Sequence, residues 1–183
     1  QRMSGSDTQA SVQDDSDADS EIEETVREAV EILGDSDAEL NERQHSASVL
    51  SCHLKRPAAV KALIDALGDS EALLTNIVLD ILRDIDPAEI TVFYEADRGI
   101  NDARSAVREQ VCRLLADVLL EVEAYPSTEL VTRLIEIARG GGRGSRKPER
   151  QAALFALNAC RQRIASAEQR VEVDELIAGA AKA

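Results

Sequence analysis

The stretch LGDSD at residues 33–37 returns with one conservative change as LGDSE at residues 67–71, a shift of 34 residues. Glycine commonly ends helices, and Asp and Ser are frequent in the turns that follow. A turn that recurs at such an interval is typical of proteins built from stacked pairs of helices. The sequence on either side shows a similar period.

The segments that follow these turns share one apolar pattern. Four anchor positions align them: Arg43, Thr75, Arg108 and Arg150. Seven residues after each anchor stands a leucine: Leu50, Leu82, Leu115 and Leu157. The residues three and six positions after each anchor are small or apolar in every copy. Since these offsets lie on one side of a helix, each copy predicts a helix with the same buried stripe.

Capping and helix-breaking residues divide the chain into helices. Ser20 with Glu23 fits the capping box that begins a helix, and Ser36 with Glu39 fits it again. Proline and glycine mark further starts and ends. The expected helices are about nine, near residues 20–33, 37–54, 57–67, 70–85, 87–97, 102–122, 127–139, 149–165 and 169–180.

The composition favours the same fold class. Aromatic residues make up only 2% of the 183 residues and there is no Trp, whereas sheets draw on aromatic and β-branched side chains. No segment shows the sustained alternation of a strand. The sequence therefore predicts an all-α protein of one domain.

Charge sets the chain apart from an average globular protein. It carries 35 Asp and Glu against 21 Lys and Arg, a net charge of −14, and only four of its basic residues are lysines. An acid-rich, lysine-poor chain is similar to proteins of salt-accumulating halophiles, which points to a halophilic archaeon. We expect molar salt to stabilise it, and its field to repel nucleic acid and anionic lipid.

The ends and the cysteines suggest how the chain is organised. Residues 1–19 are acidic and offer little to bury, so we expect a disordered tail before a domain at 20–183. No stretch approaches 18 consecutive apolar residues, which argues against a membrane span. The three cysteines are far apart and fit reduced thiols in a cytoplasm better than disulfides.

Residues 101–111, NDARSAVREQV, followed by Leu114 and Leu115, resemble the second helix of a HEAT-like repeat. Residues 67–82 resemble the same unit but carry Thr75 where the family pattern has Arg. The resemblance covers about residues 20–182. It implies a right-handed α-solenoid of about four HEAT-like helix pairs plus a C-terminal helix, with second helices lining a concave face that holds partner proteins.

The sequence predicts no catalytic, cofactor or metal site. His45 and Cys52 are seven residues apart and could share a face, but tetrahedral zinc normally needs four ligands. His53 and Cys112 fall on the repeated apolar stripe, which indicates packing. Nucleophile-elbow, P-loop and dinucleotide-binding patterns are absent from the sequence. We therefore expect a protein that is not an enzyme.

One region is basic. Residues 139–183 hold 9 basic and 5 acidic residues, a net of +4, whereas residues 1–138 hold 12 and 30, a net of −18. Most of these cations stand in or after an expected flexible Gly/Arg loop at 139–148: Arg139, Arg143, Arg146, Lys147, Arg150, Arg161 and Arg163. They could dock an acidic partner or phosphate, or pair with the protein's own carboxylates.

The anchor arginines carry a similar pair of interpretations. Arg43, Arg108 and Arg150 could pair with Asp37, Asp102 or Glu149 and link adjacent repeats, or they could line a groove for an acidic peptide. The candidate partner-binding residues are Arg104, Arg108, Arg143, Arg146, Lys147 and Arg150.

Three functions follow from the resemblance. The leading hypothesis is a non-catalytic scaffold or adaptor whose groove binds another protein. A nucleic-acid-binding or DNA-glycosylase-like HEAT protein is the second, opposed by the net charge of −14 and the lack of Trp. A lyase or chaperone for a chromophore protein is the third, because the repeat also resembles those of phycobilisome lyases.

Overall fold

A computed structural model describes residues 10–84, 90–121, 126–141 and 146–181. This part of the chain is helical and contains no strand, so the all-α prediction is confirmed. Its elements are α1 (Ala10–Gly34), α2 (Leu40–Ser51), α3 (Pro57–Ala66), α4 (Ala72–Arg83), α5 (Ile90–Gly99), α6 (Ser105–Glu121), α7 (Thr128–Ala138), α8 (Lys147–Cys160), the 3-10 turn η1 (Arg161–Arg163) and α9 (Ala167–Ala180).

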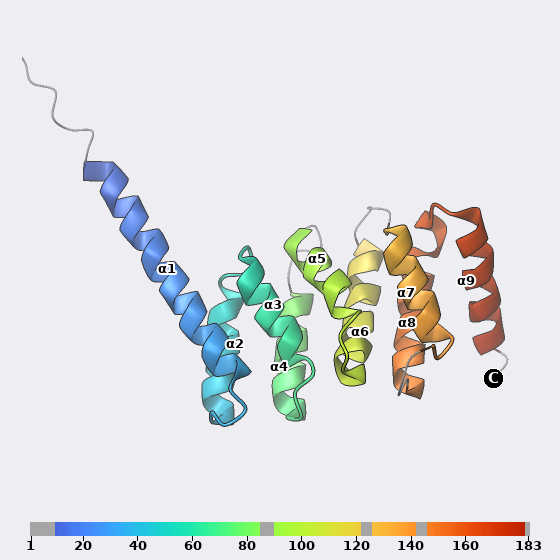
Figure 1. The fold of residues 1–183 in the computed structure, drawn as a ribbon, viewed down its shortest axis with the longest axis horizontal. Helices are drawn as coiled ribbons and strands as arrows, with labels where there is room; N and C mark the ends of the chain where they lie inside the picture. The colour runs from blue at the N-terminus through green and yellow to red at the C-terminus, as the bar shows by residue number, and fades with distance from the viewer. Residues whose placement is uncertain (1–9, 85–89, 122–125, 142–145, 182–183) are drawn as a thin grey trace, which may run out of the picture.

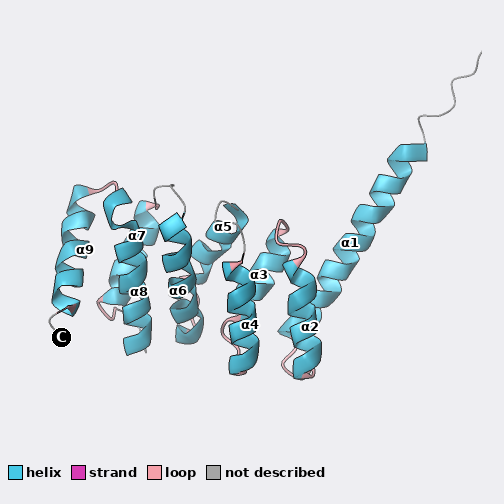
Figure 2. Ribbon diagram, turned by 180° about the vertical axis from the view of Figure 1, so that it is seen from behind, coloured by secondary structure: helices cyan, strands magenta, loops and turns pink. Residues whose placement is uncertain are grey.

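The helices follow one another in two layers. Figure 1 shows α1, α3, α5 and α7 on the near side, with α1 and α9 at opposite ends of the row. Seen from behind, α2, α4, α6 and α8 form the other layer (Figure 2). Each helix of the second layer packs on its predecessor in the chain and on its neighbours in the layer. Among the described helices, α6 and α8 share the most extensive contact.

The repeated leucines lie where the two layers meet. Leu50, Leu82, Leu115 and Leu157 are fully or almost fully buried, which confirms the predicted stripe. Three buried alanines of α8 belong to the same core: Ala152, Ala153 and Ala156. Their short side chains let α8 approach α6 closely, and close packing gives the core its dispersion energy.

Several helix starts differ from the sequence prediction, and those of α1 and α2 have identifiable causes. α1 begins at Ala10, ten residues before Ser20, because each residue added to an existing helix gains a hydrogen bond without a new nucleus. Residues 10–19 extend beyond the other helices (Figure 1), and burial begins near Val26. The domain boundary at residue 20 therefore stays a prediction, and residues 1–9 lie outside the described residues.

The turn before α2 explains the second difference. α2 begins at Leu40, and neither Ser36 nor Glu39 caps it with a side-chain hydrogen bond, so the capping-box interpretation is wrong. The Asp35 carboxylate accepts a hydrogen bond from the Asp37 amide instead, at 2.9 Å. This aspartate competes for the turn and delays the helix.

The same aspartate turn recurs in the next two repeats. Asp69 accepts from the amide of Glu71 at 2.8 Å, and Asp102 accepts from the amide of Arg104 at 2.8 Å. Both turns precede a helix of the second layer, α4 and α6. The period seen in the sequence is therefore present in the backbone geometry of the turns.

Candidate protein-binding groove

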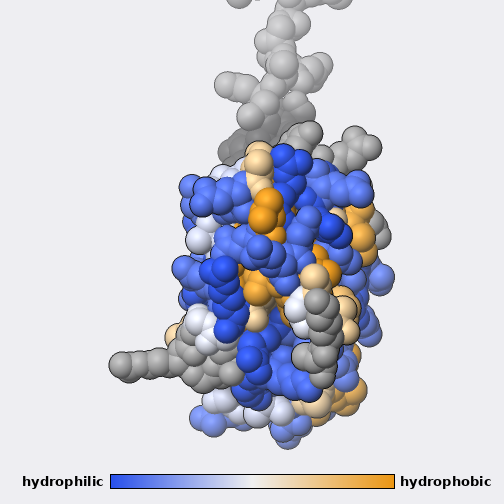
Figure 3. Space-filling model, turned by 90° about the vertical axis from the view of Figure 1, so that its right-hand side faces the viewer, coloured by the Kyte–Doolittle hydropathy of each residue, from blue (hydrophilic) through white to orange (hydrophobic). Residues whose placement is uncertain are grey.

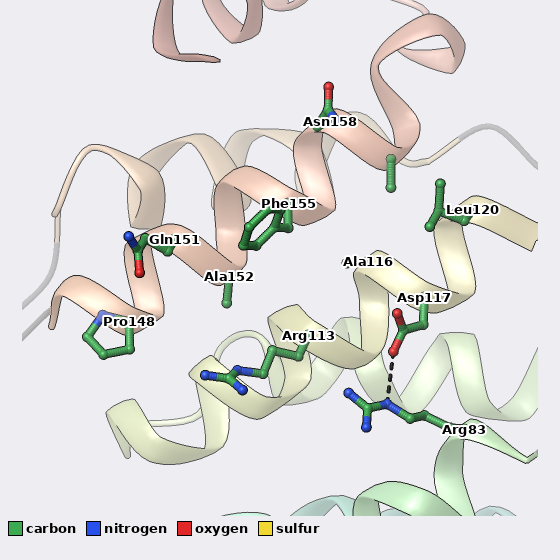
Figure 4. A pocket seen from close by; sticks show the side chains of 11 residues that line it. Arg83, Arg113, Ala116, Asp117, Leu120, Pro148, Gln151, Ala152, Phe155 and Asn158 are labelled. Atoms are coloured by element: carbon green, nitrogen blue, oxygen red, sulfur yellow. Dashed lines mark hydrogen bonds and ion pairs between the residues drawn. The ribbon is translucent and has the colours of Figure 1, made fainter. Parts of the chain in front are cut away.

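A groove of about 450 Å³ runs between α6 and α8, with α4 at its edge. α6 contributes Ala116 and Leu120, and α8 contributes Pro148, Ala152 and Phe155. Figure 4 shows Phe155 and Leu120 projecting from the facing helices rather than into the core. The groove is therefore a largely apolar surface on the outer side of the second layer.

Phe155 and Leu120 are the most exposed large apolar side chains in the described part of the chain, at 68% and 69%. The inner face of α8 is filled by other residues, such as Ala153 and Leu157. Phe155 thus stands where a solvent-facing polar residue is the ordinary choice. Neighbouring exposed apolar side chains in a concave surface are a feature of protein-binding sites.

Polar contacts border the groove on two sides. Arg83 of α4 pairs with Asp117 of α6, Nε to Oδ2 at 2.9 Å (Figure 4). Arg113 of α6 pairs with Glu109 at 2.9 Å, and Arg146 lies 4.0 Å from the same carboxylate. Asp117 neutralises Arg83 at the α4 edge of the groove. Near the N-terminus of α8, by contrast, Arg113 and Arg146 share the single carboxylate of Glu109.

Arg108 makes its contacts inside the protein. Its side chain is buried and its Nε lies 2.6 Å from Oε1 of Glu149, which is only 1% exposed. A second guanidinium nitrogen donates to the carbonyls of Asp102 and Ala103 at 2.7 and 2.8 Å. The prediction that anchor arginines link repeats is confirmed here, because Arg108 joins α6 to α8. Arg108 is therefore not available to bind a partner.

Arg43 acts in the same way between the first two helix pairs. It donates to the Leu33 carbonyl at 3.1 and 3.2 Å and pairs with Asp69 in the next turn, so the expected partner Asp37 is wrong. Burial by itself would raise the pKa of the Asp69 carboxyl. The hydrogen bonds from Arg43 and from the amides of Glu71 and Ser70 hold that pKa below its usual value.

The remaining predicted cations fall into different places. Arg104 donates two hydrogen bonds of 3.0 Å to the Asp102 carboxylate, away from the groove. These hydrogen bonds raise the pKa of Arg104 and lower the pKa of Asp102. Arg150 is exposed and lies against Gly140. A Cβ added to Gly140 would be 3.3 Å from Cδ of Arg150. Arg143 and the rest of the middle of the Gly/Arg loop, residues 142–145, lie outside the described residues.

Arg146 and Lys147 are the predicted cations closest to the groove. Arg146 is the N-cap residue of α8 and Lys147 is the first residue of that helix. Lys147 is exposed and forms no ion pair within the described residues. It precedes Gln151, which lines the groove, by one helical turn. Phe155 and Leu120 were not among the predicted partner-binding residues. Phe155, an aromatic residue outside the repeated apolar stripe, was a signal that the sequence offered.

The cysteines and histidines do not gather into a site. In the described residues, no group of three or more His, Cys, Asp or Glu is placed to hold a metal ion. Cys52 is exposed, while burial raises the pKa of Cys112 and brings that of Cys160 to about 11. Thiols with such pKa values are poor nucleophiles at neutral pH.

The helices of the described part are also too short or too polar to cross a membrane.

Comparison with known proteins gives no further assignment. No protein-family model matches the chain. No curated protein is significantly similar to it in sequence.

Proposed function

We propose that the chain is a non-catalytic scaffold or adaptor that binds a segment of another protein in the groove between α6 and α8. One observation carries the proposal: Phe155 and Leu120, two large apolar side chains on facing helices, are about two-thirds exposed beside a groove of about 450 Å³. Covering such side chains stabilises a complex by roughly 25 cal/mol per Å² of apolar surface removed from water.

The helices that form the groove are held firmly. Arg108 and Glu149 join α6 to α8 inside the protein, and the alanines of α8 pack against the core of α6. A groove with fixed walls loses little conformational entropy when a partner binds. This rigidity supports a binding function based on shape.

We further propose that the helices form a short right-handed HEAT-like α-solenoid, and that the groove belongs to its concave face. The repeated leucine register and the three aspartate turns support this arrangement. The free cysteines support a reducing compartment such as the cytoplasm. No contact in the described residues favours the nucleic-acid or chromophore-lyase alternatives over protein binding.

The proposal is tested by affinity capture from the native host with a matched pair of variants. Phe155→Asp places a charge in the groove, whereas Val171→Asp places one at another exposed apolar residue, on α9. Wild type and Val171→Asp should retain the same partner, and Phe155→Asp should lose it, as measured by quantitative mass spectrometry. A partner retained by Phe155→Asp would exclude this groove as the binding site.

A further inference from the structure

The two ends of the groove differ in charge. At the N-terminal end of α8, Arg113 and Arg146 share the single carboxylate of Glu109, at 2.9 and 4.0 Å. Glu109 is mostly buried, with 13% of its side chain exposed, so it reaches solvent less than either arginine. Lys147 adds a further exposed cation, and Glu149 in the first turn of α8 is already paired with Arg108. This end is positive in a chain whose net charge is −14.

The other end of the groove is apolar. Phe155, Leu120 and Ala159 line it, and the nearby Arg83 is neutralised by Asp117. From Pro148 to Ala159, the lining residues of α8 span about 16 Å, which is the length of about three helical turns. A helical segment of about 11 residues would therefore cover the groove from its positive to its apolar end.

Resting on the proposed function, we propose that the groove binds an amphipathic helix of a partner protein that carries acidic residues at one end and bulky apolar residues at the other. The acidic end lies over Arg113 and Lys147, and the apolar end covers Phe155 and Leu120. A helix suits this surface because the described part of the chain offers no strand edge to extend. Charge then fixes the direction of the bound segment, and apolar contact supplies most of its affinity.

Two other described surfaces lack this combination. The cavity beside the first two turns is lined by cations that already have partners, Arg43 with Asp69 and Lys61 with Asp65. Figure 3 looks onto the α9 end and shows mainly hydrophilic residues with small apolar patches between them. The groove is the surface where exposed apolar side chains and incompletely neutralised cations meet.

Three fluorescent peptides of about 11 residues, each held helical by the same side-chain staple, test the inference by fluorescence anisotropy. The first carries glutamates in one terminal turn and leucines in the others, the second has lysines in place of the glutamates, and the third has alanines in place of the leucines. We expect the glutamate–leucine peptide to bind at least about tenfold more tightly than either of the others. Molar KCl should reduce its preference over the lysine peptide, because exposed charges are screened.

Protein variants assign the two ends. Lys147→Glu should weaken the glutamate–leucine peptide about tenfold and Phe155→Ala should weaken it at least as much. The controls are Arg170→Glu and Val171→Ala on α9, which remove an exposed cation and an exposed apolar side chain elsewhere. Both controls should bind the peptide like wild type, and circular dichroism should show that all four variants are folded.

The outcomes separate this inference from the proposed function. Equal binding of the glutamate and lysine peptides, or no binding of any peptide, would overturn the inference, while the capture experiment with Phe155→Asp decides the proposed function independently. A dimer in sedimentation velocity that Phe155→Ala dissociates would show a second copy in the groove and also overturn it. Tighter binding of a single-stranded oligonucleotide than of the glutamate–leucine peptide would do the same.

Discussion

The two copies of the Leu-Gly-Asp-Ser turn have the same sequence but different surroundings. At Gly34, a Cβ would meet no atom within 4 Å. At Gly68, a Cβ would lie 2.4 Å from Cγ2 of Val107 in α6, well inside van der Waals contact. The same glycine is therefore a simple helix end in one turn and a point of close helix approach in the other.

The anchor residue after each turn accounts for the difference. After the first turn, Arg43 fills the junction by binding the Leu33 carbonyl and Asp69. After the second, the anchor is Thr75, whose short side chain reaches only the Asp69 carbonyl, at 3.5 Å. The junction is filled instead from the following repeat, because Val107 and Arg104 lie against Gly68. Repeats of one sequence pattern can thus be joined either by a buried ion pair or by close packing.

The largest effect is expected at the third junction, where Arg108 and Glu149 form the most buried ion pair. Arg108→Met should lower the free energy of unfolding by about 3–5 kcal/mol, because it leaves the Glu149 carboxylate buried without a partner. Arg43→Met should cost less, since its partner Asp69 keeps more contact with solvent. Urea unfolding of both variants measures the difference.

A second substitution separates the ion pair from its desolvation cost. Arg108→Met combined with Glu149→Met removes both charges and should recover most of the stability lost in the single variant. If Arg43→Met proved as destabilising as Arg108→Met, burial would not be what distinguishes the two junctions.

The middle junction is tested by alanine at the two equivalent glycines. Gly68→Ala should cost about 1–3 kcal/mol, because Val107 is fully buried and its β-branched side chain has little room to turn. Gly34→Ala meets no neighbour and should leave stability unchanged or raise it by less than about 1 kcal/mol. Equal effects of the two substitutions in urea unfolding would contradict the proposed close approach.

The sequence predicted those parts of the fold that depend on period. The leucine register could be read because burial recurs at helical spacing, and all four leucines are buried. The start of α2 could not, because Ser36 and Glu39 satisfy a capping pattern while Asp35 closes the turn by accepting from the Asp37 amide. Local patterns of this kind identify a turn without deciding which side chain closes it.

The candidate site was harder to predict because it depends on contacts between distant residues. The sequence left open whether Arg108 binds a carboxylate of the protein or a partner, because the pairing with Glu149, 41 residues further along the chain, is fixed only by the fold. Phe155 was recognisable as an aromatic residue off the buried stripe. That it lines one groove together with Leu120 follows from the stacking of α6 and α8, which one sequence does not specify.

A smaller effect on stability, dependent on pH, should distinguish Asp69 in the second turn from Asp97 in α5. The pKa of Asp69 is lowered in the folded protein, so its ionised form contributes stability above the unfolded value of about 3.9. That contribution is lost as the pH falls through the folded pKa. Burial raises the pKa of Asp97 beside Glu129, so ionisation of Asp97 lowers stability as the pH rises through its folded value.

Asparagine at the two positions should therefore change stability in opposite directions at neutral pH. Asp69→Asn should destabilise the protein at about pH 7 and lose this effect as the pH falls through the lowered pKa of Asp69, whereas Asp97→Asn should be neutral or stabilising at about pH 7. Urea unfolding across this range measures both. A loss for Asp69→Asn that does not depend on pH would show that the carboxylate acts by shape alone.

Thermal unfolding in a series of KCl concentrations compares the junctions further. It also tests whether the acidic surface is stabilised by salt. With a net charge of −14, the surface carboxylates repel one another, and molar KCl should raise the midpoint of thermal unfolding by screening them. The buried Arg108–Glu149 pair is screened much less, so the loss caused by Arg108→Met should persist in the same KCl series. A flat or falling midpoint would contradict the comparison with halophilic proteins. A loss that disappeared with salt would place the Arg108–Glu149 pair in solvent contact, and the third junction would then be no more buried than the first.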